Sequence, residues 1–337
     1  MRVFQVQDDW SMENLRMAER PEPQAGPGQV LLRMRAASLN YRDLLVPKRG
    51  YGALTGTLPL IPISDGVGDV VAVGDGVTRV RVGDRVCPIM IQSWIGGEAT
   101  AERVRQILGG PLDGVMTELM VVDAEGVVRV PPHLTDAEAA ALPCAALTAW
   151  SAVVTHGGVR AGDVVLVQGC GGVSLFALQF AKLHGARVII LSSSDARLER
   201  AQAMGADVGI NYRTTPEWGR VVREQAGGDG VDQVIEVGGS ATLPQSLRAV
   251  RAGGTISLIG VLSGAKIDAA LGPIVTRQVR LQGIACGSRD GFEAMLRAIA
   301  EHHLRPAIDR VFAFEELHPA LAHLATGAQF GKVCLHM

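Results

Sequence analysis

Three glycines within residues 169–172 are the residues whose type and spacing point most directly to chemistry. They follow residues 164–167, an apolar run rich in valine that suits a strand buried on both faces, and precede a predicted helix over residues 173–184. Glycine permits a tight turn and a close backbone approach, and the first helical turn offers unpaired N–H groups and the positive end of its dipole. We therefore predict a pyrophosphate-binding turn of a dinucleotide site, with Ser174 where such turns usually have a third glycine or an alanine. The alternative is a glycine cluster that serves packing alone.

Side chains at the end of the second predicted strand indicate which dinucleotide is bound. Residues 188–191 form that strand, and Ser192 and Ser193 follow it, with Arg197 shortly after. An NAD site usually has an acidic residue here for the ribose 2′-hydroxyl, whereas two hydroxyls and a cation suit a 2′-phosphate. Asp195 opposes this interpretation, but we expect it to cap the following helix. The sequence thus favours NADPH over NADH, with a solvated surface charge as the alternative role for Arg197.

Strands and helices alternate around and after the glycine turn. Strands are predicted at residues 164–167, 188–191, 208–210, 231–237, 255–259 and 279–284, and helices between them at 195–204, 216–225 and 241–250. Such alternation predicts a parallel sheet with helices on both faces. Two more amphipathic helices are predicted at residues 290–302 and 315–326, with a closing strand at 332–335.

The first part of the chain, residues 1–128, follows a different pattern. Short strands are predicted at residues 30–36, 67–73 and 115–122, and residues 80–86 are predicted to turn through Gly83 and Asp84 into another strand. Glycines punctuate these strands, which indicates a small barrel. The polar segment 94–110 is predicted to be partly helical. Pro131 and Pro132 mark the joint between the two patterns, and Thr135 and Glu138 then have the spacing of a helix capping box.

Length and composition restrict the class of protein. A chain of 337 residues is long for one domain, so two are expected. The formal net charge of −2 gives no reason to expect nucleic acid or a membrane surface as partner. No apolar run reaches the roughly 18–20 residues that span a bilayer. The five cysteines, at positions 87, 144, 170, 286 and 334, include no close pair, which argues against a disulfide framework and favours a reduced, cytoplasmic protein.

Motifs spread along nearly the whole chain carry a family resemblance. They lie at residues 37–43, 63–66, 71–74, 82–86, 142–148, 169–172, 205–207, 210–212 and 331–333. In these segments the chain resembles the medium-chain dehydrogenase/reductase superfamily, and within it the zinc-independent quinone oxidoreductase branch. The resemblance implies an α/β fold with two domains. One is a GroES-like, β-rich catalytic domain of residues 1–128, completed by 288–337, and the other is a doubly wound Rossmann cofactor domain of residues 129–287.

Three positions of this resemblance decide whether a catalytic metal is expected. Zinc-dependent members hold the ion with a Cys, a His and a second Cys, and the corresponding residues here are Asn40, Ser64 and Cys144. Zinc needs three good protein ligands beside an open position, and one thiolate is not enough even with Asp65 as a weak substitute. We therefore expect no metal, and we expect Cys144 to be a small packed residue near the nicotinamide.

Without a Lewis acid, the residues that stabilise a developing oxyanion must be hydrogen-bond donors of the chain. By family position these are Asn40 and Tyr41, and Thr148 resembles the residue that flanks the nicotinamide. The alternatives are loop stabilisation by the first two side chains and helix packing by the third. Arg42 and Asp43 are expected to form an ion pair at the surface or in a loop.

The resemblance also implies a set of cofactor-binding positions. They are Gly169, Gly171, Gly172, Val173, Ser192, Ser193, Arg197, Tyr212, Gly238, Gly260, Val261, Ala285, Cys286 and Lys332. Tyr212, beside Arg213, would lie near the 2′-phosphate, and Gly260 near the nicotinamide ribose. Ala285 would lie near the carboxamide, and Lys332 would reach back to the phosphates.

These features together predict an NADPH-dependent, zinc-independent oxidoreductase that transfers hydride to a quinone or an α,β-unsaturated carbonyl compound. One alternative is an alcohol dehydrogenase of the same superfamily. Another is a nucleotide-binding regulatory or RNA-associated protein with little activity, although no basic, aromatic-interleaved stripe supports it. The expected partners are a small-molecule substrate and a second copy of the chain, paired along the predicted edge strand 279–284, with neither nucleic acid nor membrane.

Overall fold

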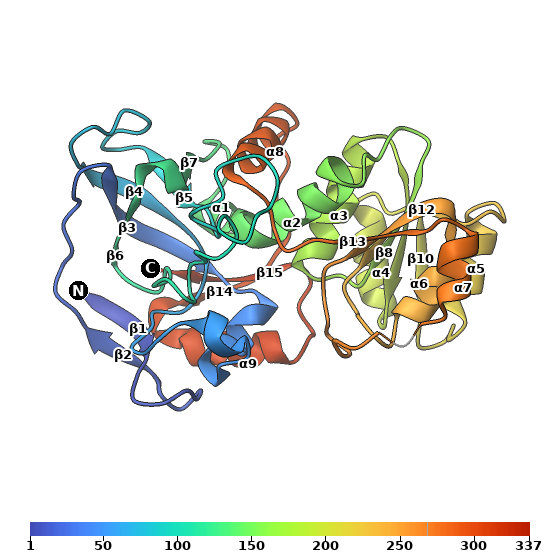
Figure 1. The fold of residues 1–337 in the computed structure, drawn as a ribbon, viewed down its shortest axis with the longest axis horizontal. Coiled ribbons are helices and arrows are strands. Elements are labelled where there is room, and N and C mark those ends of the chain that lie inside the picture. Colours follow the sequence, from blue (N-terminus) through green and yellow to red (C-terminus); the bar gives the residue numbers. More distant parts are fainter. Residues whose placement is uncertain (268) are drawn as a thin grey trace. The chain divides into compact units, whose positions relative to one another are not determined.

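The computed structural model describes residues 1–267 and 269–337, which form two compact units (Figure 1). Unit 1 consists of Met1–Leu147 and Cys286–Met337, and unit 2 consists of Thr148–Ala285. The domain limits expected from the sequence lay at residues 128/129 and 287/288. Unit 1 extends further because the segment after the two prolines packs on its sheet, where helix α1 (Asp136–Ala140) contacts strands β3 and β4.

Unit 1 is built on a seven-stranded sheet and a separate two-stranded hairpin. The sheet order is β14, β15, β3, β4, β5 and β7, with β6 also paired to β3. The bounds are β1 (Arg2–Val6) and β2 (Leu15–Glu19) for the hairpin, and β3 (Gln29–Ser38), β4 (Asp65–Val73), β5 (Arg85–Pro88), β6 (Leu119–Asp123), β7 (Val127–Arg129), β14 (Ile308–Ala313) and β15 (Lys332–His336) for the sheet.

The register between β3 and β15 brings together residues far apart in the sequence. The two strands are antiparallel, with Cys334 opposite Ser38 and Leu335 opposite Ala37. Beyond the strand end, the backbone N–H of Leu39 donates to the carbonyl oxygen of Val333 at 2.9 Å. The same register carried one residue further places Lys332 opposite Asn40.

Helices and helical turns of unit 1 connect and cover these strands. The bounds are η1 (Tyr41–Leu44), η2 (Val46–Lys48), η3 (Gly52–Thr55), η4 (Ala124–Gly126), η5 (Leu142–Ala146), α8 (Arg289–Glu301), η7 (Phe314–Glu316) and α9 (Leu317–Ala325). The predicted capping box is confirmed, since Thr135 Oγ1 accepts from the Glu138 N–H and the Glu138 carboxylate accepts from the Thr135 N–H.

One local prediction in unit 1 was wrong. Residues 94–110, all of them described, contain no helix, because polar groups there bond to the loop backbone, as Ser93 Oγ does to the Arg103 carbonyl oxygen at 2.8 Å. The predicted turn at Gly83 and Asp84 is confirmed, and it leads into strand β5. Gly83 has φ of +91°, and the Asp84 carboxylate accepts from the Arg81 N–H.

Unit 2 is a six-stranded sheet in which every strand pair is parallel. The strand order is β10, β9, β8, β11, β12 and β13, so β10 and β13 are the edges. The bounds are β8 (Val164–Gln168), β9 (Arg187–Ser192), β10 (Val208–Asn211), β11 (Val231–Glu236), β12 (Val250–Leu258) and β13 (Arg280–Gly283). The predicted alternation is therefore confirmed, strand by strand.

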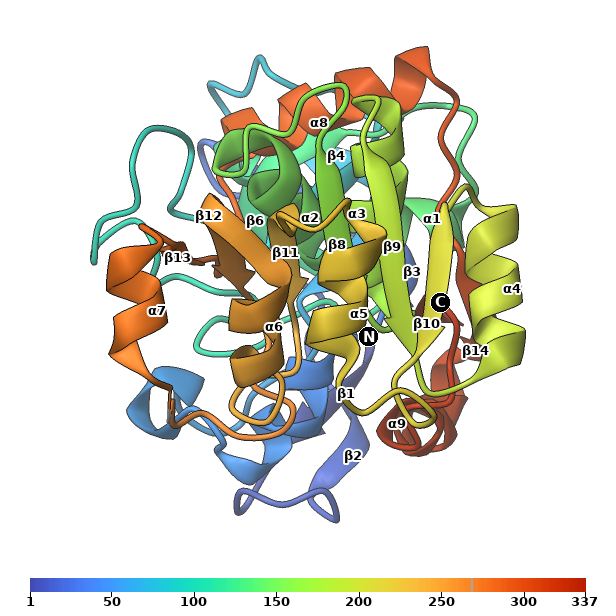
Figure 2. The same ribbon diagram turned by 90° about the vertical axis from the view of Figure 1, so that its right-hand side faces the viewer.

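Helices cover both faces of this sheet, as predicted. Figure 2 looks onto the sheet, with α5 and α6 in front of it and α3 behind. The bounds are α2 (Leu147–Trp150), η6 (Ser151–Thr155), α3 (Gly172–Leu183), α4 (Asp195–Ala203), α5 (Trp218–Gln225), α6 (Leu243–Ala249) and α7 (Leu271–Thr276). Within residues 1–267 and 269–337, helices long and apolar enough to cross a membrane are absent.

Candidate functional site

The glycine turn of unit 2 joins β8 to α3 in the predicted way. Gly169 has φ of +74°, a conformation that a side chain disfavours, and Gly171 is the N-cap residue of α3 without a side-chain cap. A Cβ atom at Gly171 would meet nothing within 4 Å, so space lies open beside this helix N-terminus. Ser174, in the place of the third glycine, is buried and donates from Oγ to the Gln168 carbonyl oxygen at 2.6 Å. The turn thus has the features that bind a pyrophosphate.

Hydroxyl groups and a guanidinium gather after β9, as the sequence predicted. Ser192 is buried, and Arg197 Nη2 donates to Ser193 Oγ at 2.8 Å. The Tyr212 side chain is exposed, and its backbone N–H donates to the Ser192 carbonyl oxygen at 3.1 Å. The structure therefore brings the predicted 2′-phosphate residues into one neighbourhood.

Asp195 does not cap α4 as expected. Ser194 is the N-cap residue, and Asp195 is the first residue of the helix, where its negative charge still suits the helix dipole. Its Oδ1 accepts a hydrogen bond from Asn211 Nδ2 at 2.7 Å. This carboxylate is therefore held by the neighbouring strand end.

A buried carboxylate that the sequence interpretation missed organises the loop after β11. Glu236 is fully buried, and its two oxygens accept five hydrogen bonds, from the groups Gln168 Nε2, Gly238 N, Gly239 N, Thr242 Oγ1 and Ser246 Oγ. Gln168 is the last residue before the glycine turn, so Glu236 ties that turn to the loop of Gly238. The available signal was an acidic residue near the end of a predicted strand, shortly before the glycines at 238 and 239.

The loop after β12 approaches the loop after β11 at a second predicted position. A Cβ atom at Gly260 would lie 2.0 Å from the Val237 carbonyl oxygen, which only glycine avoids. Val261, the next residue, is exposed. Ala285 is exposed as well, whereas Thr148 is buried, and its hydroxyl has no hydrogen-bond partner.

Lys332 lies in unit 1 under the residue predicted as the first oxyanion donor. Its side chain is buried, and Nζ donates to the Leu39 carbonyl oxygen and to Asn40 Oδ1, at 2.6 Å each. The other end of the Asn40 amide, Nδ2, is buried and has no hydrogen-bond partner among the described residues. Tyr41, the second predicted donor, is about half exposed, at 48%.

The other two metal-ligand positions of the resemblance are also in unit 1. Ser64 Oγ donates to Asp65 Oδ1 at 2.6 Å, and Asp65 Oδ2 accepts from the Cys144 backbone N–H at 2.9 Å. The pKa of the Cys144 thiol is raised well above its ordinary value, mainly by a hydrogen bond with the Cys286 side chain and secondly by burial. In the described ranges, clusters of three His, Cys, Asp or Glu side chains able to hold a metal are absent.

Arg42 and Asp43 form the expected ion pair, but in the interior and not at the surface. Asp43 is fully buried, because its carboxylate closes η1 by accepting from the Asn40 backbone N–H at 2.7 Å. Burial raises the pKa of Asp43 to about 6, although the Arg42 charge opposes the shift. Arg42 lies 3.9 Å from Asp43 Oδ1 and donates to the Leu108 carbonyl oxygen at 3.0 Å. The two side chains are thus largely buried, and Asp43 contacts the backbone of Asn40.

Tyr51 is a neighbour of this group that sequence reasoning missed. The Arg42 guanidinium lies 6.0 Å from its ring centroid. Burial raises the pKa of Tyr51. A tyrosine after a glycine in a loop carries no pattern of its own, so only the fold reveals this position.

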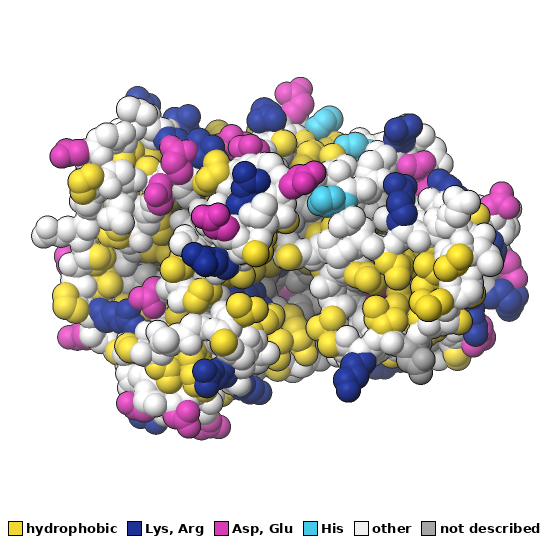
Figure 3. Space-filling view, in the orientation of Figure 1, with side chains coloured by type: hydrophobic (Ala, Val, Ile, Leu, Met, Phe, Trp, Pro, Cys, Tyr) yellow, Lys and Arg dark blue, Asp and Glu magenta, His cyan; other side chains and the backbone are white. Residues whose placement is uncertain are grey.

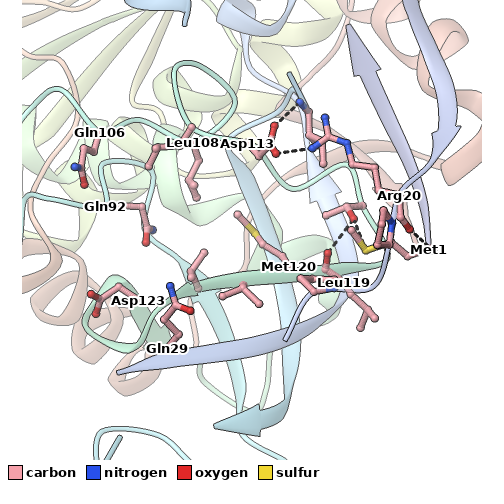
Figure 4. A pocket seen from close by; sticks show the side chains of 18 residues that line it. Met1, Arg20, Gln29, Gln92, Gln106, Leu108, Asp113, Leu119, Met120 and Asp123 are labelled. Atoms are coloured by element: carbon pink, nitrogen blue, oxygen red, sulfur yellow. Dashed lines mark hydrogen bonds and ion pairs between the residues drawn. The ribbon is translucent and has the colours of Figure 1, made fainter. Parts of the chain in front are cut away.

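A cavity of about 520 Å³ in unit 1 is lined in part by Leu108, whose carbonyl oxygen accepts from Arg42 (Figure 4). It is lined by residues such as Met1, Gln29 and Met120, and Arg20 and Asp113 form an ion pair of 2.7 Å at its wall. None of the predicted site residues lines it. The chemistry predicted from the sequence therefore lies elsewhere.

Comparison with known proteins identifies the family of this arrangement. The profile of the alcohol dehydrogenase GroES-like domain matches residues 26–132, and that of the zinc-binding dehydrogenases matches residues 172–301. A zinc-type alcohol dehydrogenase-like protein of Schizosaccharomyces pombe is 39% identical over 340 residues, which cover 98% of each chain. The chain belongs to the medium-chain dehydrogenase/reductase superfamily. The predicted pair of a GroES-like and a Rossmann domain is thereby confirmed.

Other members of the superfamily that resemble this chain carry different activities in their names. The crystal structure of an NAD-dependent alcohol dehydrogenase matches with a TM-score of 0.91 and 34% identity, over 100% of both chains. An acryloyl-coenzyme A reductase of Metallosphaera sedula is 29% identical over 325 residues, covering 94% of this chain and 95% of the relative. The chain is thus an oxidoreductase of this superfamily. These relatives do not single out the quinone oxidoreductase branch.

Proposed function

We propose that the protein is an NADPH-dependent, zinc-independent oxidoreductase that transfers hydride to a quinone or an α,β-unsaturated carbonyl compound. The proposal rests on the hydrogen bonding of the Asn40 side-chain amide, which stands at the first metal-ligand position of the family. Its Oδ1 is bonded to a buried ammonium group, and its Nδ2 is a buried donor without a partner. A free N–H donor of this kind suits a substrate oxygen that accepts a hydrogen bond, and it does not suit a metal ion.

The donor set at the family's metal positions does not fit a zinc ion. The Lys332 ammonium group, 2.6 Å from Asn40 Oδ1, would repel a cation bound there. Asp65 already accepts hydrogen bonds from Ser64 Oγ and from the Cys144 backbone N–H. Amide and hydroxyl groups in the places of cysteine and histidine are poor zinc ligands.

Hydrogen-bond donors then replace a Lewis acid in the proposed chemistry. Bound NADPH would supply the hydride, a π-electron pair of the acceptor would shift onto its carbonyl oxygen, and a proton from water would complete the reduction. Asn40 Nδ2–H stabilises that oxygen, and the exposed Tyr41 hydroxyl is available as a second donor. Acceptors whose charge spreads by conjugation need less polarisation than a simple ketone, which favours quinones and enones. The name of the Metallosphaera sedula relative, an acryloyl-coenzyme A reductase, agrees with a conjugated acceptor.

The residues after β9 support NADPH as the cofactor. The Arg197 guanidinium, held on Ser193 Oγ, and the hydroxyl of Ser192 can donate to a 2′-phosphate. The family's usual acidic partner for a free 2′-hydroxyl is missing at this strand end, because Asp195 is bonded to Asn211. The same arrangement would receive NADH more weakly.

A kinetic panel tests the proposal. Loss of NADPH absorbance would be followed in stopped flow with quinones, enones, an enoyl thioester, aldehydes and ketones, and alcohol oxidation would be assayed with NADP⁺. We expect turnover with conjugated acceptors alone, and a fall in kcat of about a hundredfold in Asn40→Leu, the typical effect of losing one oxyanion donor. Preferred oxidation of alcohols, or equal activity of Asn40→Leu, would contradict it.

A further inference from the structure

Asn40 is held at its backbone by a residue close in sequence and at its side chain by a residue distant in sequence. The carboxylate of Asp43 accepts from its backbone N–H at 2.7 Å, which fixes the main chain at the start of η1. The ammonium group of Lys332, brought opposite by the β3–β15 register, donates to its Oδ1 at 2.6 Å. Lys332 is only 3% exposed, so this contact is shielded from water.

A lysine partner selects one of the two orientations of a side-chain amide. An amide can turn over and exchange its oxygen with its nitrogen at little steric cost, so its hydrogen-bond partner decides which end faces where. An ammonium group has three donors and cannot accept, so it pairs with Oδ1 and rejects Nδ2. Facing Lys332 with Oδ1, Asn40 must direct Nδ2 away from the ammonium group.

In this orientation Asn40 Nδ2 is buried and has no partner among the described residues. A buried donor without an acceptor lowers stability unless a ligand accepts its hydrogen bond. A lysine that served only to neutralise nearby carboxylates would not need this contact. Its second bond, to the Leu39 carbonyl oxygen, fixes Nζ relative to the backbone that carries Asn40. Lys332 therefore holds the Asn40 amide in one orientation.

We propose that Lys332 is a positioning residue that orients the Asn40 amide so that Nδ2–H is presented to the carbonyl oxygen of the acceptor. This inference rests on the proposed function, because it assigns a role in the oxyanion contact. It differs from the expectation that Lys332 binds the cofactor phosphates, which predicts an effect on NADPH affinity and none on the amide.

A double-mutant cycle with Lys332→Met and Asn40→Leu separates the two roles. We expect Lys332→Met to lower kcat with a conjugated acceptor by about a hundredfold, as loss of an oriented oxyanion donor does. In the Asn40→Leu background the same change should have almost no further effect, since the amide it orients is gone. The dissociation constant of NADPH should stay within about threefold of the wild-type value. Lys48→Met, which changes an exposed lysine of unit 1, is the matched control and should leave all these quantities unchanged.

Two outcomes would overturn the inference. If Lys332→Met and Asn40→Leu reduce kcat by factors that multiply in the double variant, the two residues act independently. If Lys332→Met raises the NADPH dissociation constant by tenfold or more with kcat unchanged, the phosphate role is correct.

A readout without turnover keeps the inference distinguishable from the proposed function. In ¹⁵N-labelled protein the side-chain NH₂ signals of Asn40, identified by their loss in Asn40→Leu, should shift and broaden in Lys332→Met as both amide orientations become populated. Lys332→Gln, which keeps the fold more safely, can donate to Oδ1 or accept from Nδ2, so it should show the same loss of selection. Unchanged NH₂ signals in both variants would overturn the positioning role of Lys332. If the signals shift in the variants but the wild type is inactive, only the proposed function is refuted.

Discussion

Asp65 Oδ2 lies 2.9 Å from the backbone nitrogen of Cys144, and this hydrogen bond occupies the one carboxylate that could replace a missing metal ligand. With Ser64 Oγ on the other oxygen, the Asp65 carboxylate is fixed within the protein. We therefore expect well under one zinc ion per chain by elemental mass spectrometry, and activity that survives a chelator. Stoichiometric zinc, or chelator inhibition reversed by zinc, would contradict this and favour the alcohol dehydrogenase alternative.

Cofactor choice should depend on Ser192, which is buried at the end of β9. NADPH is expected to bind more tightly than NADH. Ser192→Asp should reverse the order, lowering NADPH affinity by about tenfold or more, since a carboxylate repels the 2′-phosphate and suits a free 2′-hydroxyl. Titration of protein fluorescence with both dinucleotides measures this. Asp195→Asn is the control and should not change the order, because Asn211 already holds that side chain; equal wild-type affinities would refute the assignment.

The parts of the cofactor site that were predictable are those made by contiguous segments. The strand, the glycine turn and α3 follow one another directly, so their hydrophobic pattern and glycine spacing carry the whole geometry. Ser193 and Arg197 are only four residues apart at the start of α4, so their contact is local in the sequence.

Contacts set by tertiary pairing were not predictable in the same way. Lys332 meets Asn40 only because β15 pairs with β3 in one register, which no local pattern specifies. The ion pair of Asp43 with Arg42 was expected at the surface or in a loop, because a charged residue in a polar loop is usually exposed; only the fold shows that Asp43 closes η1 inside unit 1. Segment 94–110 was misjudged because its helical composition is overridden by side-chain bonds to the loop backbone.

Asp43 should make stability depend on pH. Burial raises its pKa from 3.8 to about 6, so ionisation is harder in the folded state than in the unfolded state. Below pH 4 the carboxyl is protonated in both states, and it does not lower the free energy of unfolding. As the pH rises to about 6, that free energy falls, and above this value it is lower by about 3 kcal/mol, at 1.36 kcal/mol per pKa unit.

The variant Asp43→Asn isolates this effect. The difference in unfolding free energy, wild type minus variant, should fall between pH 4 and 6 and stay level from pH 7 to 8. Urea unfolding across this range measures it. Asp75→Asn, at an exposed position of unit 1, should show no such slope. A difference that does not vary with pH would show that Asp43 is ionised without cost.

Glu236 should be among the side chains on which the stability of unit 2 depends most. Its carboxylate accepts from five donors, and an amide in its place presents a donor to some of them. We expect Glu236→Gln to lower the free energy of unfolding by about 3 kcal/mol and to weaken dinucleotide binding, because the loop of Gly238 loses its anchor. Glu217→Gln, which breaks an exposed ion pair with Arg248, should cost less than about 1 kcal/mol by chemical unfolding. Equal costs would mean that the network relaxes freely.

The edge strand β13 and helix α7 present the features of a surface that a second copy of the chain covers. β13 lies at the edge of the six-stranded sheet as predicted, and its pairing is with β12 on one side. Leu271 and Val275 on α7 are each 73% exposed, and Figure 3 shows hydrophobic side chains gathered over this part of unit 2. An unpaired strand edge beside exposed apolar side chains is a surface that a two-fold partner satisfies.

We infer a homodimer through this surface and expect light scattering to report twice the chain mass at micromolar concentration. Leu281→Pro should weaken the dimer by removing a strand N–H and straining the edge, and Val275→Glu should weaken it by placing a charge in the apolar contact. Leu54→Glu adds the same charge at a hydrophobic residue of unit 1 that is 71% exposed, and should leave the dimer intact. A monomeric wild type would exclude the edge pairing. A dimer that resists both unit 2 variants would place the interface on another surface.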